Sequence, residues 1–256
     1  MSTASRNDVD GETWGIQRHV LSIPGPIEPV PTVLWIPDRP ADRPRPTVLL
    51  GHGGGLHKET PDIVRLAWRL VATRGFAAVA IDFPNHGERI SPDKAGLALP
   101  DLRGRQRRER WQRHNAETAD QTVAEWRAVL DEVQRRDDVG TGAVGYFGLS
   151  MGTWFGIPLI ATESRIVAAV LGLFAPPSEE SAAVFATANR ITVPLLFLLQ
   201  WQDQLFPLTD GITLFEMFGS AEKTLHGNPG RHRDIPPFEH DQIAEFLLRH
   251  LDRVDG

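Results

Sequence analysis

The sequence of 256 residues contains no cysteine. This absence excludes disulfide bonds, a thiol nucleophile and thiolate metal ligands. It leaves the compartment open, because a chain without thiols tolerates oxidising and reducing surroundings alike. Apolar runs long enough to span a membrane are also missing, as is a basic and then apolar leader in the polar start MSTASRNDVDGE. We therefore expect a cytoplasmic protein that does not contact a membrane.

An excess of positive charge is the next thing missing. Lys and Arg together number 27 against 33 Asp and Glu, which gives a formal net charge of −6. This balance argues against general attraction to nucleic acid or anionic lipid. No paired histidines one helical turn apart, phosphate-binding loop or dinucleotide fingerprint occurs, so we expect no metal and no other cofactor. The expected partner is a small molecule, and the oligomeric state stays open.

What the chain does have is a regular alternation of short apolar runs and amphipathic segments. Eight runs have the composition of strands: HVLSIP, PTVLWIP, TVLLGH, FAAVAIDFP, GAVGYFGL, IVAAVLGLFA, VPLLFLLQW and AEKTLHG. The first two are β-branched and bounded by prolines, which suits antiparallel strands at a sheet edge. Helical spacing is expected over 61–75, 114–136, 151–164, 178–190, 209–219 and 236–251.

Strands that alternate with helices imply right-handed crossovers and a mostly parallel sheet with helices on both faces. We therefore predict an α/β fold in a single domain over 16–256, preceded by a flexible tail over 1–15. Residues 91–113 break the alternation with early Pro and Gly and a later basic run, RGRQRRERWQR. We interpret them as a short lid-like insertion. The basic run suits either a solvated helical face or a lid that presents Arg to an acidic substrate.

The stretch YFGLSMGTW places Ser150 between Gly148 and Gly152, at the junction of a predicted strand and a predicted helix. A sharp turn there forces backbone close to backbone, which explains glycine two positions before and after. The turn would raise the serine hydroxyl above the sheet edge, at a helix N-terminus that favours negative charge. A capping serine in a tight turn would look similar, so the hypothesis that Ser150 is a nucleophile needs partners.

Donors for a developing oxyanion come from GHGGGL, directly after the strand-like run 47–50. Consecutive glycines let backbone N–H groups approach a ligand without side-chain interference. We predict an oxyanion site made by Gly54, its neighbour Gly55 and the N–H of Met151.

An acid and a base follow later in the chain. Asp203 comes directly after the apolar run VPLLFLLQW, whereas the rival carboxylates Asp210 and Glu216 lie further into the next helix. His232 lies in a polar loop after Pro-Gly, and we prefer it as the base over His226, which belongs to the last strand or its edge. His240 and His250 on the last helix are expected on a solvated face, and His52 and His86 are candidates to line the site.

The order Ser150, Asp203, His232 is that of α/β-hydrolases. The chain resembles this superfamily over nearly its whole length in GHGGG, AIDFPNHGE, GYFGLSMG, VPLLFLLQWQDQLFP and NPGRH. It is most similar to the dienelactone-hydrolase-like and small serine esterase branch, with serine in place of the cysteine of dienelactone hydrolases. The resemblance implies a mostly parallel eight-stranded α/β-hydrolase sheet and hydrolysis of carboxylic esters through an acyl-enzyme, without a cofactor.

The substrate pocket is expected to include Leu56, Trp154 and Phe206, which lie near predicted strand ends, although core packing is an alternative for Trp154. The same three catalytic residues could serve a thioester, an amide, a C–C bond or acyl transfer. A ligand-binding homologue without turnover is a further alternative.

Overall fold

The structure is a computed structural model that describes residues 15–90, 118–175 and 186–252. The predicted insertion near 91–113, with its basic run, lies outside them, as does the predicted N-terminal tail apart from Gly15.

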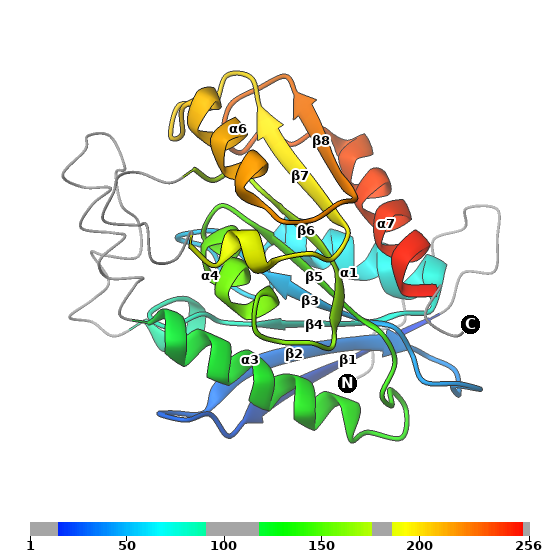
Figure 1. The fold of residues 1–256 in the computed structure, drawn as a ribbon. Coiled ribbons are helices and arrows are strands. Elements are labelled where there is room, and N and C mark those ends of the chain that lie inside the picture. Colours follow the sequence, from blue (N-terminus) through cyan, green and yellow to red (C-terminus); the bar gives the residue numbers. More distant parts are fainter. Residues whose placement is uncertain (1–14, 91–117, 176–185, 253–256) are drawn as a thin grey trace.

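An eight-stranded sheet runs through the molecule in the order β1-β2-β4-β3-β5-β6-β7-β8 (Figure 1). The strands are β1 (Ile16–Ile23), β2 (Val30–Pro37), β3 (Thr47–Gly51), β4 (Ala77–Ile81), β5 (Val144–Leu149), β6 (Ile166–Gly172), β7 (Leu195–Gln200) and β8 (Lys223–Asn228). β2 pairs antiparallel with both β1 and β4, and every other pairing is parallel. The predicted α/β fold with an antiparallel edge is confirmed.

Helices cover both faces of the sheet (Figure 1). They are α1 (Pro61–Arg74), α3 (Ala119–Gln134), α4 (Met151–Ile160), α6 (Leu208–Met217) and α7 (Pro237–Leu251). α1 and α7 pack together with one set of sheet residues, whereas α3, α4 and α6 bury the other set. Of the helix predicted over 178–190, only the end is described, and there Ala188–Arg190 form a 3₁₀ turn. No helix in the described ranges is both long and apolar enough to cross a membrane.

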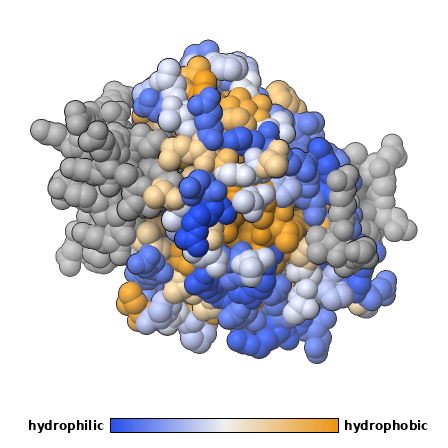
Figure 2. All heavy atoms as spheres, viewed as in Figure 1, coloured by the Kyte–Doolittle hydropathy of each residue, from blue (hydrophilic) through white to orange (hydrophobic). Residues whose placement is uncertain are grey.

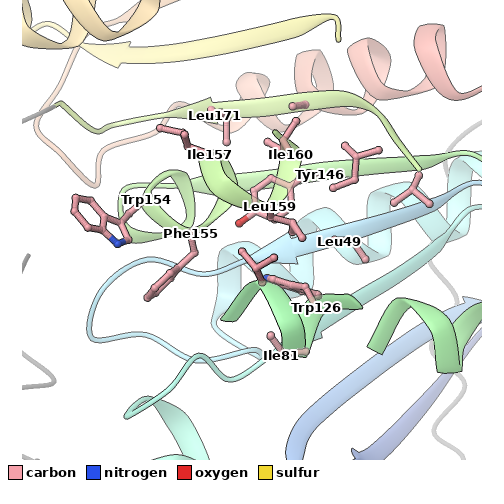
Figure 3. Close-up of a cluster of buried hydrophobic side chains, with 14 of the residues drawn as sticks. Leu49, Ile81, Trp126, Tyr146, Trp154, Phe155, Ile157, Leu159, Ile160 and Leu171 are labelled. Carbon is pink, nitrogen blue, oxygen red and sulfur yellow. The ribbon is translucent and has the colours of Figure 1, made fainter. Parts of the chain in front are cut away.

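α4 is the most buried helix and therefore the most firmly placed. Its sequence MGTWFGIPLI contains no charged residue, and nine of its ten residues are buried. Figure 3 shows Leu159 and Ile160 of α4 near Tyr146 of β5, with Trp126 of α3 below and Trp154 apart from them. Such dense packing on all sides fixes the start of the helix, where Ser150 lies.

The turn into α4 has the backbone conformation that the sequence predicts. Ser150 has φ 57° and ψ −115°, a backbone region that residues with a side chain rarely adopt. A Cβ on Gly148 would lie 2.6 Å from the Gly152 carbonyl oxygen, and one on Gly152 would lie 2.7 Å from the Gly51 oxygen. Both glycines are therefore required by close backbone packing, as predicted.

The surface over α3, α4 and α6 is mixed in character. In the view of Figure 2, hydrophobic residues reach the surface in the middle of this face and hydrophilic side chains surround them. The exposed large hydrophobic residues in the described ranges are Val20, Ile27, Ile90, Trp201, Ile212, Met217 and Phe238, of which only Ile212 and Met217 share an element, α6. In a sheet of this kind a ligand site is expected at the carboxyl ends of the parallel strands.

Candidate active site

Three side chains from three loops at the carboxyl ends of strands form one hydrogen-bonded chain. The Ser150 hydroxyl lies 3.1 Å from Nε2 of His232, and Nδ1 of His232 lies 2.7 Å from Oδ2 of Asp203. Ser150 follows β5, Asp203 follows β7 and His232 follows β8. The structure thus brings together three residues that are distant in the sequence: Ser150 lies 82 positions before His232, and Asp203 lies 29 positions before it.

Asp203 is held firmly for this contact. Its Oδ1 accepts the backbone N–H groups of Leu205 at 2.7 Å and Phe206 at 3.1 Å, which leaves Oδ2 for His232. The side chains of Asp203 and His232 are only 7% and 6% exposed, so little water competes for their contact. A carboxylate fixed in this way orients the imidazole, with Nδ1 as the donor and Nε2 facing Ser150.

The rival residues lie in other contacts. Nδ1 of His226 is 2.7 Å from Oε1 of Glu239, at the start of α7. Asp210 accepts a hydrogen bond from Thr209, and Glu216 is exposed on α6. None of the three joins the chain that contains Ser150, which supports the preference for His232 and Asp203.

The loop after β3 is built around His52. Its Nε2 accepts the Phe83 N–H at 3.1 Å, and its Nδ1 donates to the Gly53 carbonyl at 2.9 Å. Burial lowers the pKa of His52 to about 3, with a further contribution from the neighbouring His86. His52 is therefore neutral near neutral pH, and because both of its nitrogens are occupied it cannot take a proton from Ser150.

In the same loop, the N–H of Gly54 faces away from the hydrogen bonds that hold the loop. The Gly53 carbonyl accepts from both His52 and Leu56 N–H. The N–H of Gly54 belongs to the same trans peptide group as the Gly53 carbonyl and points in the opposite direction. It therefore points away from His52 and the Leu56 N–H. Gly53 and Gly54 line the cavity that contains Ser150. Neither Gly55 nor Met151 is among its lining residues: Gly55 carries the positive φ of 70° that the turn needs, and Met151 is the first residue of α4, next to Ser150.

A cavity of about 200 Å³ opens beside Ser150. Its walls are mainly apolar, with Leu56, Phe147, Leu149, Leu173, Ile235 and Ile243 beside polar groups of the loop after β3, α1 and α7. Leu56 lies where it was predicted. Trp154 and Phe206 do not line this cavity: Trp154 is 1% exposed and packs against Phe174, and Phe206 packs against Phe174 and His232.

The expectation that His240 and His250 lie on a solvated face is wrong. They are only 5% and 7% exposed, because α7 packs against the sheet and α1. His240 lines the cavity beside Ser150.

Sequence reasoning also missed a buried ionic cluster beneath the loop after β3. Lys58 and Asp82 are 3% and 0% exposed, and Nζ of Lys58 lies 2.7 Å from Oδ2 of Asp82 and 2.5 Å from Glu88. Burial raises the pKa of Asp82, but Lys58 and the backbone N–H groups of Lys58 and Glu88 outweigh this and hold it below its ordinary value. The cluster ties the loop after β3 to the loop after β4.

Thr153 is a second group that no sequence motif indicates. Its buried hydroxyl lies 2.9 Å from the Gly148 oxygen and 2.7 Å from the Gly172 oxygen, and it accepts the Gly172 N–H at 2.8 Å. The Ser150 N–H also donates to the Gly172 oxygen, at 2.9 Å. Thr153 therefore joins the turn at Ser150 to the end of β6.

Metal ligation has no support within the described part of the chain, where no cluster of three or more His, Asp or Glu side chains could hold an ion. The arrangement offers acid–base and nucleophilic groups instead: a hydroxyl, an imidazole, a buried carboxylate and backbone N–H groups around one apolar cavity.

Solved structures with this fold include several hydrolases. A cold-adapted esterase from an Arctic intertidal metagenomic library matches with a TM-score of 0.76 and 32% identity over 97% of this chain and 99% of that one. An acetyl xylan esterase from Paenibacillus sp. R4 has a TM-score of 0.68 at 16% identity, over 96% and 87% of the two chains. A dienelactone hydrolase from Anabaena variabilis has a TM-score of 0.66 at 17% identity, over 92% and 99%. The last two show likeness of fold alone.

Comparison with curated proteins finds no significant match. A family model described as "Alpha/beta hydrolase family" matches residues 48–253, which include every residue of the Ser150–His232–Asp203 chain. The match covers well over half of the sequence, and the 32% identical esterase agrees with it along nearly the full length. The chain belongs to the alpha/beta hydrolase family, and the predicted resemblance is confirmed.

Proposed function

We propose that this protein is a serine esterase that cleaves small-molecule carboxylic esters. The observation that carries the proposal is the hydrogen-bonded chain of Ser150, His232 and Asp203, of which Ser150 and His232 line an apolar cavity. Three groups in this order of contact can activate a hydroxyl that is otherwise a weak nucleophile. The names of the similar structures, an esterase at 32% identity among them, support the same reaction class.

In the proposed mechanism, the Ser150 hydroxyl oxygen attacks the ester carbonyl carbon while Nε2 of His232 takes the hydroxyl proton. Asp203 keeps Nδ1–H of His232 in place and stabilises the imidazolium. The negative charge that forms on the carbonyl oxygen is stabilised by the N–H groups of Gly54 and Met151, the second of which is the first N–H of α4.

The tetrahedral intermediate then collapses. His232 returns its proton to the departing alcohol, which leaves an acyl group on Ser150. A water molecule, deprotonated by His232, attacks this acyl group, and a second collapse releases the carboxylic acid and restores the Ser150 hydroxyl. Every proton passes through His232, so the cycle needs no cofactor.

A change of Ser150 to Ala tests the proposal directly. We expect kcat on short p-nitrophenyl esters to fall about a millionfold, because the members of such a chain act as a unit. Covalent labelling by a fluorophosphonate should disappear as well. Ser22→Ala is the matched control, since Ser22 is exposed on the edge strand β1. A folded wild-type protein that neither hydrolyses esters nor takes the label would overturn the proposal.

The base is tested by two histidine variants. His232→Gln should lower kcat by several orders of magnitude, whereas His226→Gln, which changes only the contact with Glu239, should leave most activity. If His226→Gln abolishes turnover and His232→Gln does not, the assignment of the base is wrong. Turnover of thioesters or amides in preference to esters would keep the mechanism and change the substrate class.

A further inference from the structure

The cavity beside Ser150 has polar lining groups that the proposed chemistry does not use. Besides Ser150 and apolar residues, its lining includes Thr60 at the start of α1 and His240 near the start of α7. Neither Thr60 nor His240 contacts Ser150, His232 or Asp203 through any hydrogen bond in the described structure. Polar groups at the end of an apolar cavity commonly fix the orientation of a ligand.

Thr60 is the clearest of these groups. It is the N-cap residue of α1, where a threonine hydroxyl ordinarily accepts a backbone N–H of the first turn. Here the side chain makes no capping bond, and its Oγ1 is buried without any hydrogen-bond partner. Thr60 is only 5% exposed and lines the cavity. Buried hydroxyl groups in native proteins are nearly always satisfied, so this one calls for a ligand.

The start of α1 adds further donors beside Thr60. Pro61 has no N–H, and the first helical bond runs from Val64 N–H to the Thr60 oxygen. The N–H groups of Asp62 and Ile63 therefore have no partner within the helix. Both residues line the cavity. A helix of 14 residues directs partial positive charge to this point, which favours an oxygen atom that accepts hydrogen bonds.

His240 comes from the neighbouring helix α7. Burial lowers its pKa, and although Asp62 and the Pro237 carbonyl offset part of this shift, the ring is neutral near neutral pH. No hydrogen bond of normal geometry reaches its buried Nδ1. Nε2 lies 4.0 Å from Oδ1 of Asp62. A neutral imidazole beside a carboxylate disfavours an anionic ligand group and suits an uncharged one.

From these contacts we propose that Thr60, the start of α1 and His240 together bind an uncharged hydroxyl group carried by the ester substrate, away from its scissile carbonyl. The hydroxyl oxygen accepts a hydrogen bond from Thr60 or the first N–H groups of α1, and its O–H donates one to a ring nitrogen of His240. This inference rests on the proposed esterase function and adds the substrate class: esters of hydroxylated acyl or alcohol chains.

Matched substrates test the inference on both sides of the ester. Ethyl hexanoate and ethyl octanoate are compared with the same esters bearing a terminal hydroxyl, and hexyl acetate with its terminal hydroxy counterpart, by pH-stat titration. We expect kcat/KM to favour the hydroxylated member of one series by about tenfold or more, because plain chains leave buried polar groups unpaired. The series that shows the preference identifies whether the acyl or the alcohol part occupies the cavity.

Thr60→Val removes the hydroxyl at nearly constant volume. It should abolish most of the preference, by raising kcat/KM for the plain ester or lowering it for the hydroxylated one. The control is Thr73→Val on the same helix, since Thr73 is exposed and bonds only the Arg69 carbonyl. Should Thr60→Val fail to fold, His240→Phe tests the opposite wall with the same substrates.

Three results separate this inference from the function on which it rests. If ethyl acetate is hydrolysed but wild type prefers plain esters, or a terminal carboxylate, over the hydroxylated ones, the inference is wrong and the esterase function stands. An unchanged preference in both Thr60→Val and His240→Phe would overturn it in the same way. If no ester is hydrolysed and Ser150 takes no fluorophosphonate, the function fails and the inference with it.

Discussion

Ser150 adopts a backbone conformation that costs about 1–3 kcal/mol for a residue with a side chain. Such a residue keeps its place only if its surroundings determine it. Thr153 does this through one hydroxyl, which bonds the end of β5 at Gly148 and the end of β6 at Gly172. Since Gly172 also accepts the Ser150 N–H, the two contacts share one partner. We therefore regard Thr153 as a positioning residue for Ser150.

Replacing Thr153 with Val tests this role. We expect kcat to fall by about 10- to 100-fold with little change in KM, because small displacements of a nucleophile are costly for reaction geometry. Thr153→Ser keeps the hydroxyl and should recover most of kcat. The rate of fluorophosphonate labelling provides a second readout. A loss of thermal stability in Thr153→Val without a change in kcat or labelling rate would show that Thr153 only supports the fold.

At this scale the sequence predicts some site residues and not others. Ser150, Asp203 and His232 carry signals that can be seen in one dimension: a glycine-flanked serine, a carboxylate after an apolar run, and their order. Trp154 was expected in the pocket from its place near a strand end, but position along the chain does not tell which way a side chain points. Thr60 and Thr153 carry no motif. The role of Thr60 depends on a side-chain hydrogen bond that is missing, and the role of Thr153 depends on two strands that meet only in the folded chain.

Among the elements, the loops after β3 and β4 depend on each other. Lys58 in the first loop donates both its backbone N–H and its ammonium to Asp82, which follows β4. Asp82 also accepts the Glu88 N–H at 3.0 Å. The loop that contains Gly54 is therefore anchored from below by a charge pair that is almost fully buried.

Removing one partner of this pair should be far more harmful than removing both. Lys58→Met leaves the Asp82 carboxylate buried and unpaired, and we expect a loss of about 3–5 kcal/mol in the free energy of unfolding. Lys58→Met combined with Asp82→Asn should recover part of that loss. Arg65→Met is the control, because Arg65 pairs with Asp62 on the exposed surface of α1. Urea denaturation of the four proteins measures these differences.

The pH dependence of the pair follows from the direction of its shifts. The pKa of Asp82 is lowered on folding, so its contribution is present above its unfolded value of about 4 and is lost as the pH falls through the lower folded value. Burial lowers the pKa of Lys58, but hydrogen bonds to Asp82 and Glu88 outweigh this and raise it. Its contribution is therefore lost only as the pH rises above its unfolded value. If the loss of unfolding free energy caused by Lys58→Met alone disappeared near neutral pH, this account would be wrong.

Strands were easier to predict than helix details. The eight runs correspond to the eight strands because each is short and bounded by turn residues, and all except AEKTLHG are mainly apolar. The burial of His240 and His250 was missed, since an amphipathic pattern shows which residues are apolar but not that a neighbouring helix covers polar positions at the edge of the stripe. Pairing of α1 with α7 is a tertiary fact, and it is what brings Thr60 and His240 to one cavity.

In the whole molecule, histidines buried in the neutral state make the fold sensitive to mild acid. His52 is 1% exposed, and its Nε2 must stay unprotonated to accept the Phe83 N–H. Burial and the nearby His86 hold its pKa at about 3, against 6.5 in an unfolded chain. Between these values the unfolded chain binds a proton that the folded one does not, so stability must fall as the pH is lowered. Burial lowers the pKa of His19 and His240 as well, with the same sign.

His52→Gln isolates the contribution of this one histidine. Glutamine can accept the Phe83 N–H but does not titrate, so the variant should lose less stability than wild type between pH 6 and pH 4. The slopes of unfolding free energy against pH should differ by at most about 1.4 kcal/mol per pH unit, the limit for one histidine. His57→Gln, at an exposed position of the same loop, should follow the wild-type curve. Urea denaturation at several pH values gives the slopes. Parallel curves for His52→Gln and wild type would contradict this account. They would mean that His52 is protonated in the folded protein, which would leave the Phe83 N–H without its acceptor.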